Sequence, residues 1–203
     1  MPATKSEASH KRLLARDRRQ QLEDAALSCI ARGGIRAFTV DQVAAEAGVS
    51  RGLIAHHFGS IEGLLVAVYS RMFHQWREIM AHPRPDRLPI EALIDALFGD
   101  DLFGRQALTI WLTLWGEIAT NPLLGAEHRA QYAGYRDSIM AALTATAKAN
   151  GRQIDVDPLA TGFICLVDGL GVQRCIEPAL LSAEDARTAC RVYLEPHLGP
   201  LAV

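Results

Sequence analysis

The residues whose types and spacing could do chemistry lie between positions 50 and 58. On a helix there, Ile54 and Phe58 point the same way, because they are four residues apart. The other faces then carry small, basic and imidazole groups, namely Arg51, Gly52, Ala55, His56 and His57. A face of this kind fits a DNA major groove, where a guanidinium can pair bidentately with guanine. The stretch therefore predicts DNA recognition.

Two short helices and a turn must position this face. Thr39 can cap the first helix, and Gln42 stands where a capping box requires Glu or Gln. Gly48 occupies a turn position that needs a positive φ, and Ser50 can cap the second helix. An earlier helix, over about residues 16–32, completes a three-helix unit. We expect a helix-turn-helix DNA-binding domain over residues 16–65.

The chain carries no recognisable catalytic constellation. It lacks HExxH, GxSxG and phosphate-loop motifs. His56 and His57 are adjacent, so on a helix they diverge by about 100° and cannot chelate one metal ion. We therefore expect no enzyme, no catalytic residues, no metal and no cofactor. The four cysteines form no CxxC pair, and we expect buried, reduced thiols in a cytoplasmic protein.

Length and composition indicate an all-α protein. The chain has 203 residues, 49% apolar and 22% charged, and its helical patterns are separated by Gly and Pro breaks. About nine helices are expected, with residues 66–203 forming a larger ligand-binding and dimerisation domain. Residues 1–60 have a basic excess and residues 61–203 an acidic one, which suits an N-terminal DNA contact. No apolar run long enough to cross a bilayer is expected.

Residues 1–15 are small and polar, and include Lys5, Lys11 and Arg12. Two interpretations remain open. They form either a disordered tail or a flexible basic arm that contacts DNA phosphates.

Aromatic residues in the second half indicate a cavity. Trp111 and Trp115 are four residues apart, so they face the same way on one helix. Phe103 and either Tyr132 or Tyr135 are expected nearby. Core packing is the commoner role of such a pair, whereas the functional interpretation is a ligand pocket, because aromatic faces bind organic cations.

The last two helices carry unusual glycines. Gly162, Gly169 and Gly171 lie within an otherwise apolar helical stretch, where each costs about 1 kcal/mol relative to alanine. Close packing by another helix explains them, either within one chain or between two chains.

The N-terminal stretch resembles the TetR family of bacterial transcriptional repressors over about residues 20–68. The residues that carry the resemblance are Gly33-Gly34, Phe38-Thr39-Val40, Ala44-Ala45-Glu46-Ala47-Gly48-Val49-Ser50, His56-His57-Phe58 and Glu62-Gly63-Leu64-Leu65. The resemblance implies operator contacts from Thr39, Ser50, Arg51, Gly52, Leu53, His56 and His57. Arg51 is the expected base-recognition residue. Thr39, Ser50 and His57 are expected to hold phosphates.

Two positions depart from the family pattern. Ala55 stands where many relatives have Tyr, and Ile61 where many have Lys, so two backbone contacts are missing. Basic residues of the tail, Lys11, Arg12, Arg16 and Arg18, are expected to compensate.

The C-terminal part resembles the BetI-type branch of the family through IWLTLWGEIATNPLL and FICLVDGLGVQRCI. The resemblance implies a homodimer whose interface is a four-helix bundle from the last two helices. It also implies a small-molecule inducer, and choline is the leading named ligand. Choline-type members carry a large aromatic residue after Asp-Gly-Leu, where this chain has Gly171. A larger or less cationic ligand is therefore an equal alternative.

Two functional hypotheses follow. The first is a repressor that an inducer releases from double-stranded operator DNA, with the helix over residues 60–81 as the lever between the two domains. The second is a helical interaction or scaffold protein whose helix-turn-helix no longer binds DNA.

Overall fold

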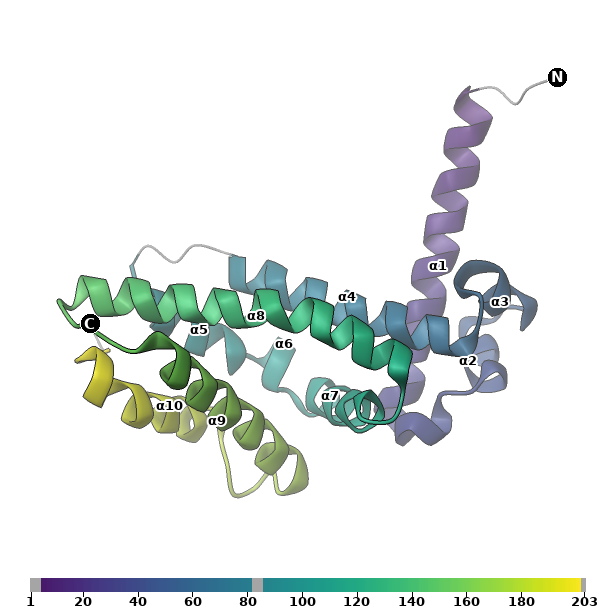
Figure 1. Ribbon diagram of the computed structural model, residues 1–203. Coiled ribbons are helices and arrows are strands. Elements are labelled where there is room, and N and C mark those ends of the chain that lie inside the picture. Colours follow the sequence, from purple (N-terminus) through teal and green to yellow (C-terminus); the bar gives the residue numbers. More distant parts are fainter. Residues whose placement is uncertain (1–4, 82–85, 202–203) are drawn as a thin grey trace.

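The computed structural model describes the backbone of residues 5–81 and 86–201, and the side chains of residues 16–79, 81 and 86–201. Within these ranges the chain contains helices and no strand, which confirms the all-α prediction (Figure 1). The elements are α1 (Lys5–Gly33), η1 (Gly34–Ala37), α2 (Val40–Ala47), α3 (Gly52–Phe58), α4 (Ile61–Ala81), α5 (Pro89–Leu97), α6 (Asp100–Phe103), α7 (Arg105–Ile118), α8 (Pro122–Ala149), α9 (Val156–Ile176) and α10 (Ala183–Leu198). The short α6 and η1 are additions to the nine predicted helices.

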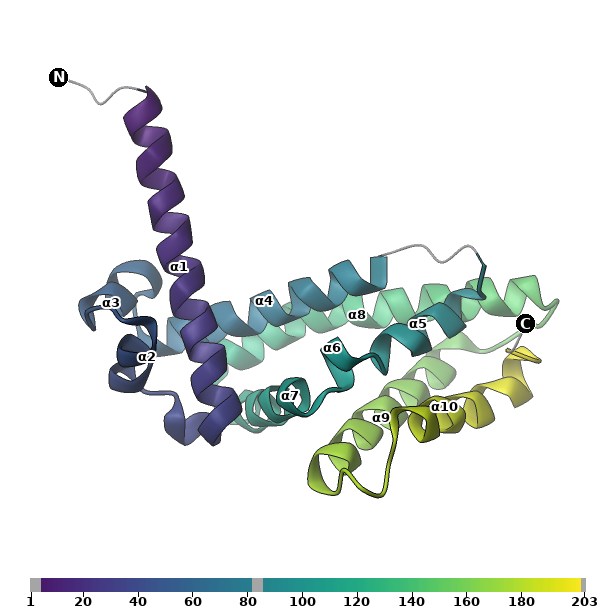
Figure 2. The same ribbon diagram turned by 180° about the vertical axis from the view of Figure 1, so that it is seen from behind.

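The helices form an elongated body with the helix-turn-helix unit at one end (Figure 1). The long helices α4 and α8 pack side by side, and α9 and α10 pack together next to α8 (Figures 1 and 2). Helix α1 packs against both α2 and α4, and its N-terminal half extends away from the body. Helix α4 therefore contacts α3 and α1 on one side and α8 on the other.

The first helix begins earlier than the sequence indicated. It starts at Lys5, whereas the sequence predicted a flexible arm over residues 1–15 and a helix from about residue 16. The segment 5–32 contains neither Gly nor Pro and is rich in Ala, Leu, Arg, Lys and Gln, all of which favour helix. The predicted DNA contacts of Lys11 and Arg12 lie outside the described side chains.

The caps of the helix-turn-helix follow the sequence prediction in two of three cases. The Thr39 hydroxyl accepts a hydrogen bond from the Gln42 amide at 3.3 Å, and Gly48 adopts a φ of 63°. Ser50 does not cap α3, because the helix starts at Gly52 and its N-cap is Arg51. The carbonyl of Ser50, rather than its hydroxyl, accepts from the Leu53 amide at 3.1 Å.

Polar contacts lock α2 onto α1. The Gln21 side chain donates to the Ala47 carbonyl at 2.7 Å. Glu46 accepts from the Ser28 hydroxyl at 2.7 Å and pairs with Arg32 at 2.8 Å. These contacts surround an apolar core with no solvent exposure at Leu22, Ala26, Cys29, Ile30, Val43, Leu64 and Val68. The position of α2, and hence of the turn before α3, is fixed by this packing.

A buried ion pair anchors the last helix. Glu91 on α5 is 4% exposed, and Arg191 on α10 donates to both of its carboxylate oxygens, at 2.9 and 3.1 Å. Arg87 also lies 3.9 Å from this carboxylate, so the loss of Arg191 would leave the buried Glu91 with one more distant cation and without its two direct hydrogen bonds. The arrangement ties α10 to the body of the same chain.

Two prolines lie at helix boundaries that local sequence rules misplace. Asp157 before Pro158 is the expected N-cap of a helix, but α9 begins at Val156 with Asp155 as its N-cap, so Pro158 lies in its first turn. Glu195-Pro196 is expected to stop a last helix that runs to about residue 194, but α10 continues through Pro196 to Leu198. A proline in a final turn removes only one intrahelical bond, and Gly199 closes the helix by donating to the Glu195 carbonyl at 2.9 Å.

Helix α9 corrects two further expectations. It has 21 residues and a window of mean hydropathy 1.4, so by length and composition it could cross a membrane, contrary to the prediction that no apolar run is long enough. Only 28% of that window is buried within the chain. Cys165 is exposed and Cys175 is partly exposed, whereas Cys29 and Cys190 are buried as expected. The sequence pattern could not reveal that one apolar face of α9 lies at the surface.

Candidate functional site

The first candidate site is the outward face of α3. Ile54 is 1% exposed and anchors the helix in the core. The exposed residues on this face and at its start are Ser50, Arg51, Gly52, Ala55 and His56, while Leu53 and His57 are partly buried. Thr39, the N-cap of α2, is exposed as well. A Cβ added at Gly52 would meet no atom within 4 Å. The structure therefore brings the seven predicted DNA-contact residues to one end of the molecule with most of them open to a partner.

Arg51 has a partner that the sequence did not indicate. Its guanidinium forms an ion pair with Asp41 in the first turn of α2, and both side chains are well exposed. Asp41 and Arg51 are ten residues apart in the sequence. The turn at Gly48, between α2 and α3, brings their side chains together. In the free protein, the expected base-recognition residue is thus held by a neighbouring carboxylate.

His57 is fixed from behind by α1. The Arg19 guanidinium donates to the His57 carbonyl at 3.0 Å and lies 4.3 Å from the centroid of the Phe58 ring. Burial, together with the nearby His56 and Arg19, lowers the pKa of His57. A neutral imidazole can donate one hydrogen bond to a phosphate oxygen but adds no charge.

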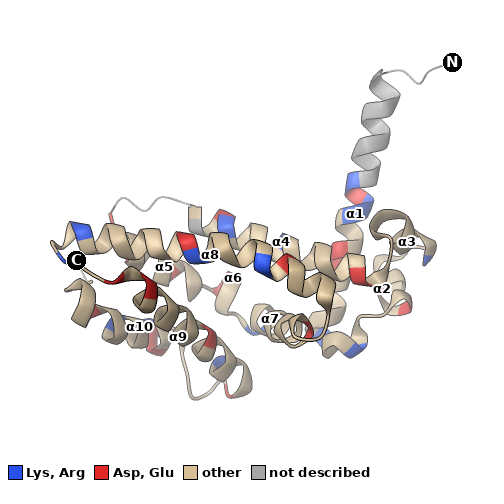
Figure 3. Cartoon of the chain, viewed as in Figure 1, with Lys and Arg blue, Asp and Glu red and all other residues tan. Residues whose placement is uncertain are grey.

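The charges of the described helices do not form one large basic face. In the view of Figure 3, acidic and basic residues alternate along the body and the described part of α1. Contacts of α3 with an anionic partner would therefore depend on a few placed residues rather than on a broad basic surface.

The second candidate site is a cavity of about 110 Å³ in the body. This volume is far above the 10–15 Å³ that one water molecule requires. The lining residues come from α4 to α9 and are Phe73, Trp76, Leu97, Leu102, Phe103, Leu108, Trp111, Trp115, His128, Tyr132, Tyr135, Val167, Asp168 and Gly171. The five predicted ligand-site residues, Phe103, Trp111, Trp115, Tyr132 and Tyr135, all belong to this lining.

The aromatic rings of the cavity are held by contacts with one another. Trp111 packs edge-on against Phe73 with ring centroids 5.3 Å apart and lies 6.3 Å from Trp115. On the opposite side, Trp76 packs edge-on against Tyr135 at 4.6 Å. Such pairs contribute about 0.5–1.5 kcal/mol each beyond burial, so the walls of the cavity are preformed.

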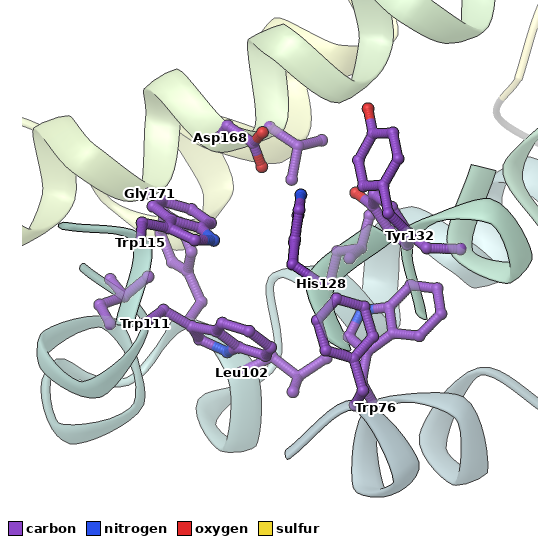
Figure 4. A pocket seen from close by; sticks show the side chains of 14 residues that line it. Trp76, Leu102, Trp111, Trp115, His128, Tyr132, Asp168 and Gly171 are labelled. Carbon is purple, nitrogen blue, oxygen red and sulfur yellow. The ribbon is translucent and has the colours of Figure 1, made fainter. Parts of the chain in front are cut away.

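Asp168 is the cavity residue that the sequence prediction missed. It projects from α9 toward the rings (Figure 4), and burial raises its pKa to about 6. Within the part of the chain that the structure describes, no hydrogen bond or ion pair reaches its carboxylate. A desolvated carboxylate without a partner is costly, so this position favours a cationic ligand. The signal in the sequence was a single acid within the apolar run 163–172.

His128 faces Asp168 from α8 (Figure 4). Its Nδ1 atom lies 2.6 Å from the hydroxyl of Tyr69, which is buried in α4. Burial and the nearby Arg129 lower the pKa of His128. Sequence reasoning also missed this residue, because nothing in a lone histidine of α8 indicates which helix it will contact.

Gly171 on α9 lies in the lining of the cavity. It is buried, and a Cβ added there would lie 3.4 Å from a terminal carbon of Leu108. A large aromatic residue at this position would occupy the cavity, so Gly171 leaves that side of the cavity open. Among the side chains that the structure describes, those of residues 16–79, 81 and 86–201, no group of three His, Cys, Asp or Glu comes close enough together to hold a metal ion.

Comparisons with known proteins assign both parts of the chain to described families. Residues 22–68 match the model of the tetR family of bacterial regulatory proteins, and residues 87–199 match that of the BetI-type transcriptional repressor C-terminal domain. The HTH-type transcriptional regulator BetI 2 of Chromohalobacter salexigens is 31% identical over 184 residues, covering 88% of this chain and 87% of the relative.

Solved structures show the same fold. A candidate regulator from Pseudomonas aeruginosa is 28% identical with a TM-score of 0.74, covering 89% of this chain and 90% of that one. A candidate regulator from Saccharomonospora viridis, solved in complex with choline, is 24% identical with a TM-score of 0.78, covering 89% of this chain and 96% of that one. These matches favour the repressor hypothesis over the scaffold hypothesis. The chain belongs to the TetR family and is a DNA-binding transcriptional repressor with a BetI-type C-terminal domain.

Proposed function

We propose that a small organic cation, bound in the cavity between α4, α7, α8 and α9, releases this repressor from its operator. The unpaired Asp168 carboxylate facing a ring of aromatic side chains carries the proposal. Cation–π contacts contribute about 0.5–2 kcal/mol each, and Asp168 supplies the counter-charge. An anionic or purely apolar ligand would leave that carboxylate unpaired or repelled.

Choline is the leading named ligand. It is a quaternary ammonium ion, and the Saccharomonospora viridis relative was solved in complex with it. That relative is only 24% identical, so the choice of a quaternary ammonium ligand depends mainly on the residues that line the cavity in this chain. The open side at Gly171 also accommodates a larger quaternary amine, which is the second candidate.

We also propose that the seven residues predicted from the helix-turn-helix contact operator DNA. Arg51 would pair with a guanine, and Thr39, Ser50 and His57 would hold phosphates. The division near residue 65 would then separate a DNA-binding domain from a ligand-binding and dimerisation domain.

Exposed apolar side chains on α9, α10 and the loop between them support dimerisation through these two helices. Ile176, Leu180 and Val192 are 68%, 81% and 68% exposed, respectively. Gly169 and Cys165 lie on the outer face of α9, and a Cβ added at Gly169 would meet no atom within 4 Å. A second copy packed on this face would bury the apolar surface of α9 and pair the two chains symmetrically.

The dimer must place its recognition helices in successive major grooves, about 34–36 Å apart or a multiple of that distance. Helix α4 is the proposed lever, because its N-terminal end packs on α3 and Trp76, toward its other end, lines the cavity. Met80 is also expected near this end of α4, but its side chain lies outside the described residues. A ligand that displaces this end of α4 would change the separation of the recognition helices.

The test uses operator release measured by fluorescence anisotropy, with choline and tetramethylammonium as inducers. The variants Trp111→Ala and Trp115→Ala should bind operator like the unmodified protein but need at least about tenfold more inducer, which corresponds to a loss of about 1.4 kcal/mol. Leu123→Ala is the matched control, because Leu123 is 61% exposed and lies outside the cavity lining. If both tryptophan variants release DNA at the unmodified protein's inducer concentration, the ligand binds elsewhere.

A further inference from the structure

The C-terminal turn of α3 is held by an arginine of α1. Helix α3 has only seven residues, so its stability depends on contacts with the rest of the chain. Arg19 donates from Nη1 to the His57 carbonyl at 3.0 Å, and its guanidinium lies 4.3 Å from the centroid of the Phe58 ring. Carbonyls in a last helical turn lack partners within their own helix, and a cation there is favourable. Arg19 therefore fixes this end of α3.

A contact at this end determines the direction of the whole helix. Ile54, near the middle of α3, is 1% exposed and is its buried anchor. The proposed DNA-contact residues Arg51 and Gly52 lie on one side of this anchor and His57 on the other. A tilt of α3 about Ile54 would thus move Arg51 relative to a base edge, while the charges of the helix stay the same.

Arg19 is itself oriented by a carboxylate on α1. Its Nε atom lies 3.2 Å from Oε1 of Glu23, one turn further along the helix, and the Glu23 side chain is 13% exposed. Burial raises the pKa of Glu23, although Arg19 and Arg71 lower it in part. The nitrogens of a guanidinium point in fixed directions. Contacts of Nε with Glu23 and of Nη1 with the His57 carbonyl therefore leave Arg19 little freedom.

Glu23 is shared with α4, which meets α3 where α1 crosses the body (Figures 1 and 2). Arg71 of α4 pairs with Asp24 through Nη2 at 2.6 Å, and its Nη1 lies 3.7 Å from Oε2 of Glu23. Among the described residues, this buried Nη1 has no hydrogen-bond partner. A buried donor without a partner is unfavourable, and a small displacement of α4 toward α1 would bring it to Glu23.

We infer that Arg19 is a positioning residue for DNA recognition and that Glu23 makes its hold on α3 depend on α4. When α4 carries Arg71 toward Glu23, the carboxylate exchanges its contact with Arg19 for a direct hydrogen bond to Arg71. Arg19 then loses the contact that orients its guanidinium, and the last turn of α3 can tilt about Ile54. The dependence on α4 rests on the proposed inducer, whereas the role of Arg19 does not.

The route runs through α1 rather than along α4 alone. Arg71 lies ten residues after Ile61, the first residue of α4, which is about 15 Å along the helix. Its side chain contacts carboxylates of α1. A change at Arg71 therefore reaches α3 through the pair of Glu23 and Arg19.

The first experiment measures DNA selectivity by fluorescence anisotropy. The probes are a duplex that the unmodified protein selects from a random pool and a scrambled duplex of the same length and composition. Arg19→Lys keeps the charge but cannot contact Glu23, the His57 carbonyl and the Phe58 ring together. The variant should lower the ratio of the two affinities by about three- to tenfold, the range of one partly exposed charged hydrogen bond.

Three controls separate positioning from charge and from folding. Arg19→Gln should lose the same selectivity and keep the salt slope of the unmodified protein, because a positioning residue contacts no phosphate. Arg36→Gln removes an exposed arginine of η1 and should leave the ratio unchanged. Thermal unfolding of each variant verifies that the chain is folded.

The second experiment tests the link through Glu23. Arg71→Gln should keep the selectivity of the unliganded protein, because Arg19 retains Glu23. It should reduce the factor by which choline weakens DNA binding by about threefold or more. Arg77→Gln, which removes an exposed arginine of α4, is the matched control. In the Arg19→Lys background, Arg71→Gln should change this factor much less, because both residues act through the same carboxylate.

The outcomes distinguish this inference from the proposed function. Unchanged selectivity in Arg19→Lys overturns the positioning role, and so does a smaller salt slope with unchanged selectivity in Arg19→Gln, which would identify a phosphate contact. If choline does not bind the unmodified protein in isothermal titration, the proposed function fails, and DNA selectivity still decides the role of Arg19. If choline releases Arg71→Gln and the unmodified protein from DNA equally well, the link through Glu23 is overturned.

Discussion

Replacing Asp168 by asparagine should stabilise the unliganded protein and abolish its response to a cation. The burial that raises the pKa of Asp168 from an ordinary 3.8 to about 6 makes the charged form unfavourable in the folded state. Each pKa unit corresponds to 1.36 kcal/mol, so a shift of about two units corresponds to about 3 kcal/mol. Because the side chain retains some solvent exposure, we expect the variant to gain about 1.5–3 kcal/mol in its free energy of unfolding.

The direction in which the stability changes with pH follows from proton binding. Between pH 3.8 and about 6 the folded state retains a proton on Asp168 that the unfolded state releases. Stability of the unmodified protein therefore falls as pH rises through this interval, and the full cost is present above pH 6. Asparagine cannot ionise, so the stability advantage of the variant should be largest near pH 7.5 and small near pH 4.

Urea denaturation of both proteins at several pH values measures the difference in their free energies of unfolding. The protein concentration is kept fixed, because the stability of a proposed dimer depends on it. The pH dependence isolates ionisation from any packing difference between the two side chains. In parallel, choline titration should show no binding by Asp168→Asn. A stability difference that is constant between pH 4 and 7.5 would refute the account of Asp168 as an unpaired, desolvated carboxylate.

Four further changes test the other proposals. Gly169→Glu should yield folded monomers in sedimentation, because the position is open in one chain, whereas Gly162→Ala should lower stability without changing the assembly, because its Cβ would overlap the Tyr193 hydroxyl. Asp41→Asn should tighten operator binding by about two- to fivefold in gel shifts, the range of an exposed ion pair, because Arg51 is released and a negative charge is removed near phosphates. Deleting residues 1–15 should weaken binding to all DNA sequences alike and reduce the salt slope, and an unchanged slope would exclude a DNA-binding arm.

The sequence was sufficient where local chemistry decides the structure. Thr39 caps α2 as predicted. An Asn directly before a proline favours a helix start, and the Asn121 side chain indeed accepts from the amides of Leu123 and Leu124 at 3.0 and 3.1 Å. Helical spacing also put Trp111 and Trp115 on one side of α7.

Residues that depend on contacts between distant helices could not be predicted. Asp168 belongs to an apolar run, and only the packing of α7 and α8 against α9 decides whether its carboxylate meets solvent or a cavity. The pair of Arg51 and Asp41 likewise requires the turn between α2 and α3. The first part of α1 lacks an apolar stripe, so the sequence was interpreted as a tail, although its residues favour helix individually.

The proposed coupling between cavity and DNA rests on three consecutive residues of α4. Tyr69 bonds to His128 of α8, and the Ser70 hydroxyl donates to Glu127 of α8 at 2.6 Å. The next residue, Arg71, turns to the opposite neighbour and pairs with Asp24 of α1 at 2.6 Å. One turn of α4 thus joins the helix that lines the cavity to the helix that holds the DNA-binding unit.

A displacement of α8 by a ligand must therefore either carry α4 and α1 with it or break these polar contacts. Each contact contributes about 0.5–1.5 kcal/mol net, and charged ones contribute more. Their sum is comparable to the coupling free energy of about 1–3 kcal/mol that is typical between two allosteric sites. The contacts are thus strong enough to transmit the displacement rather than yield to it. Because the coupling is a property of the shared equilibrium, operator DNA must weaken inducer binding by the same factor as inducer weakens DNA binding.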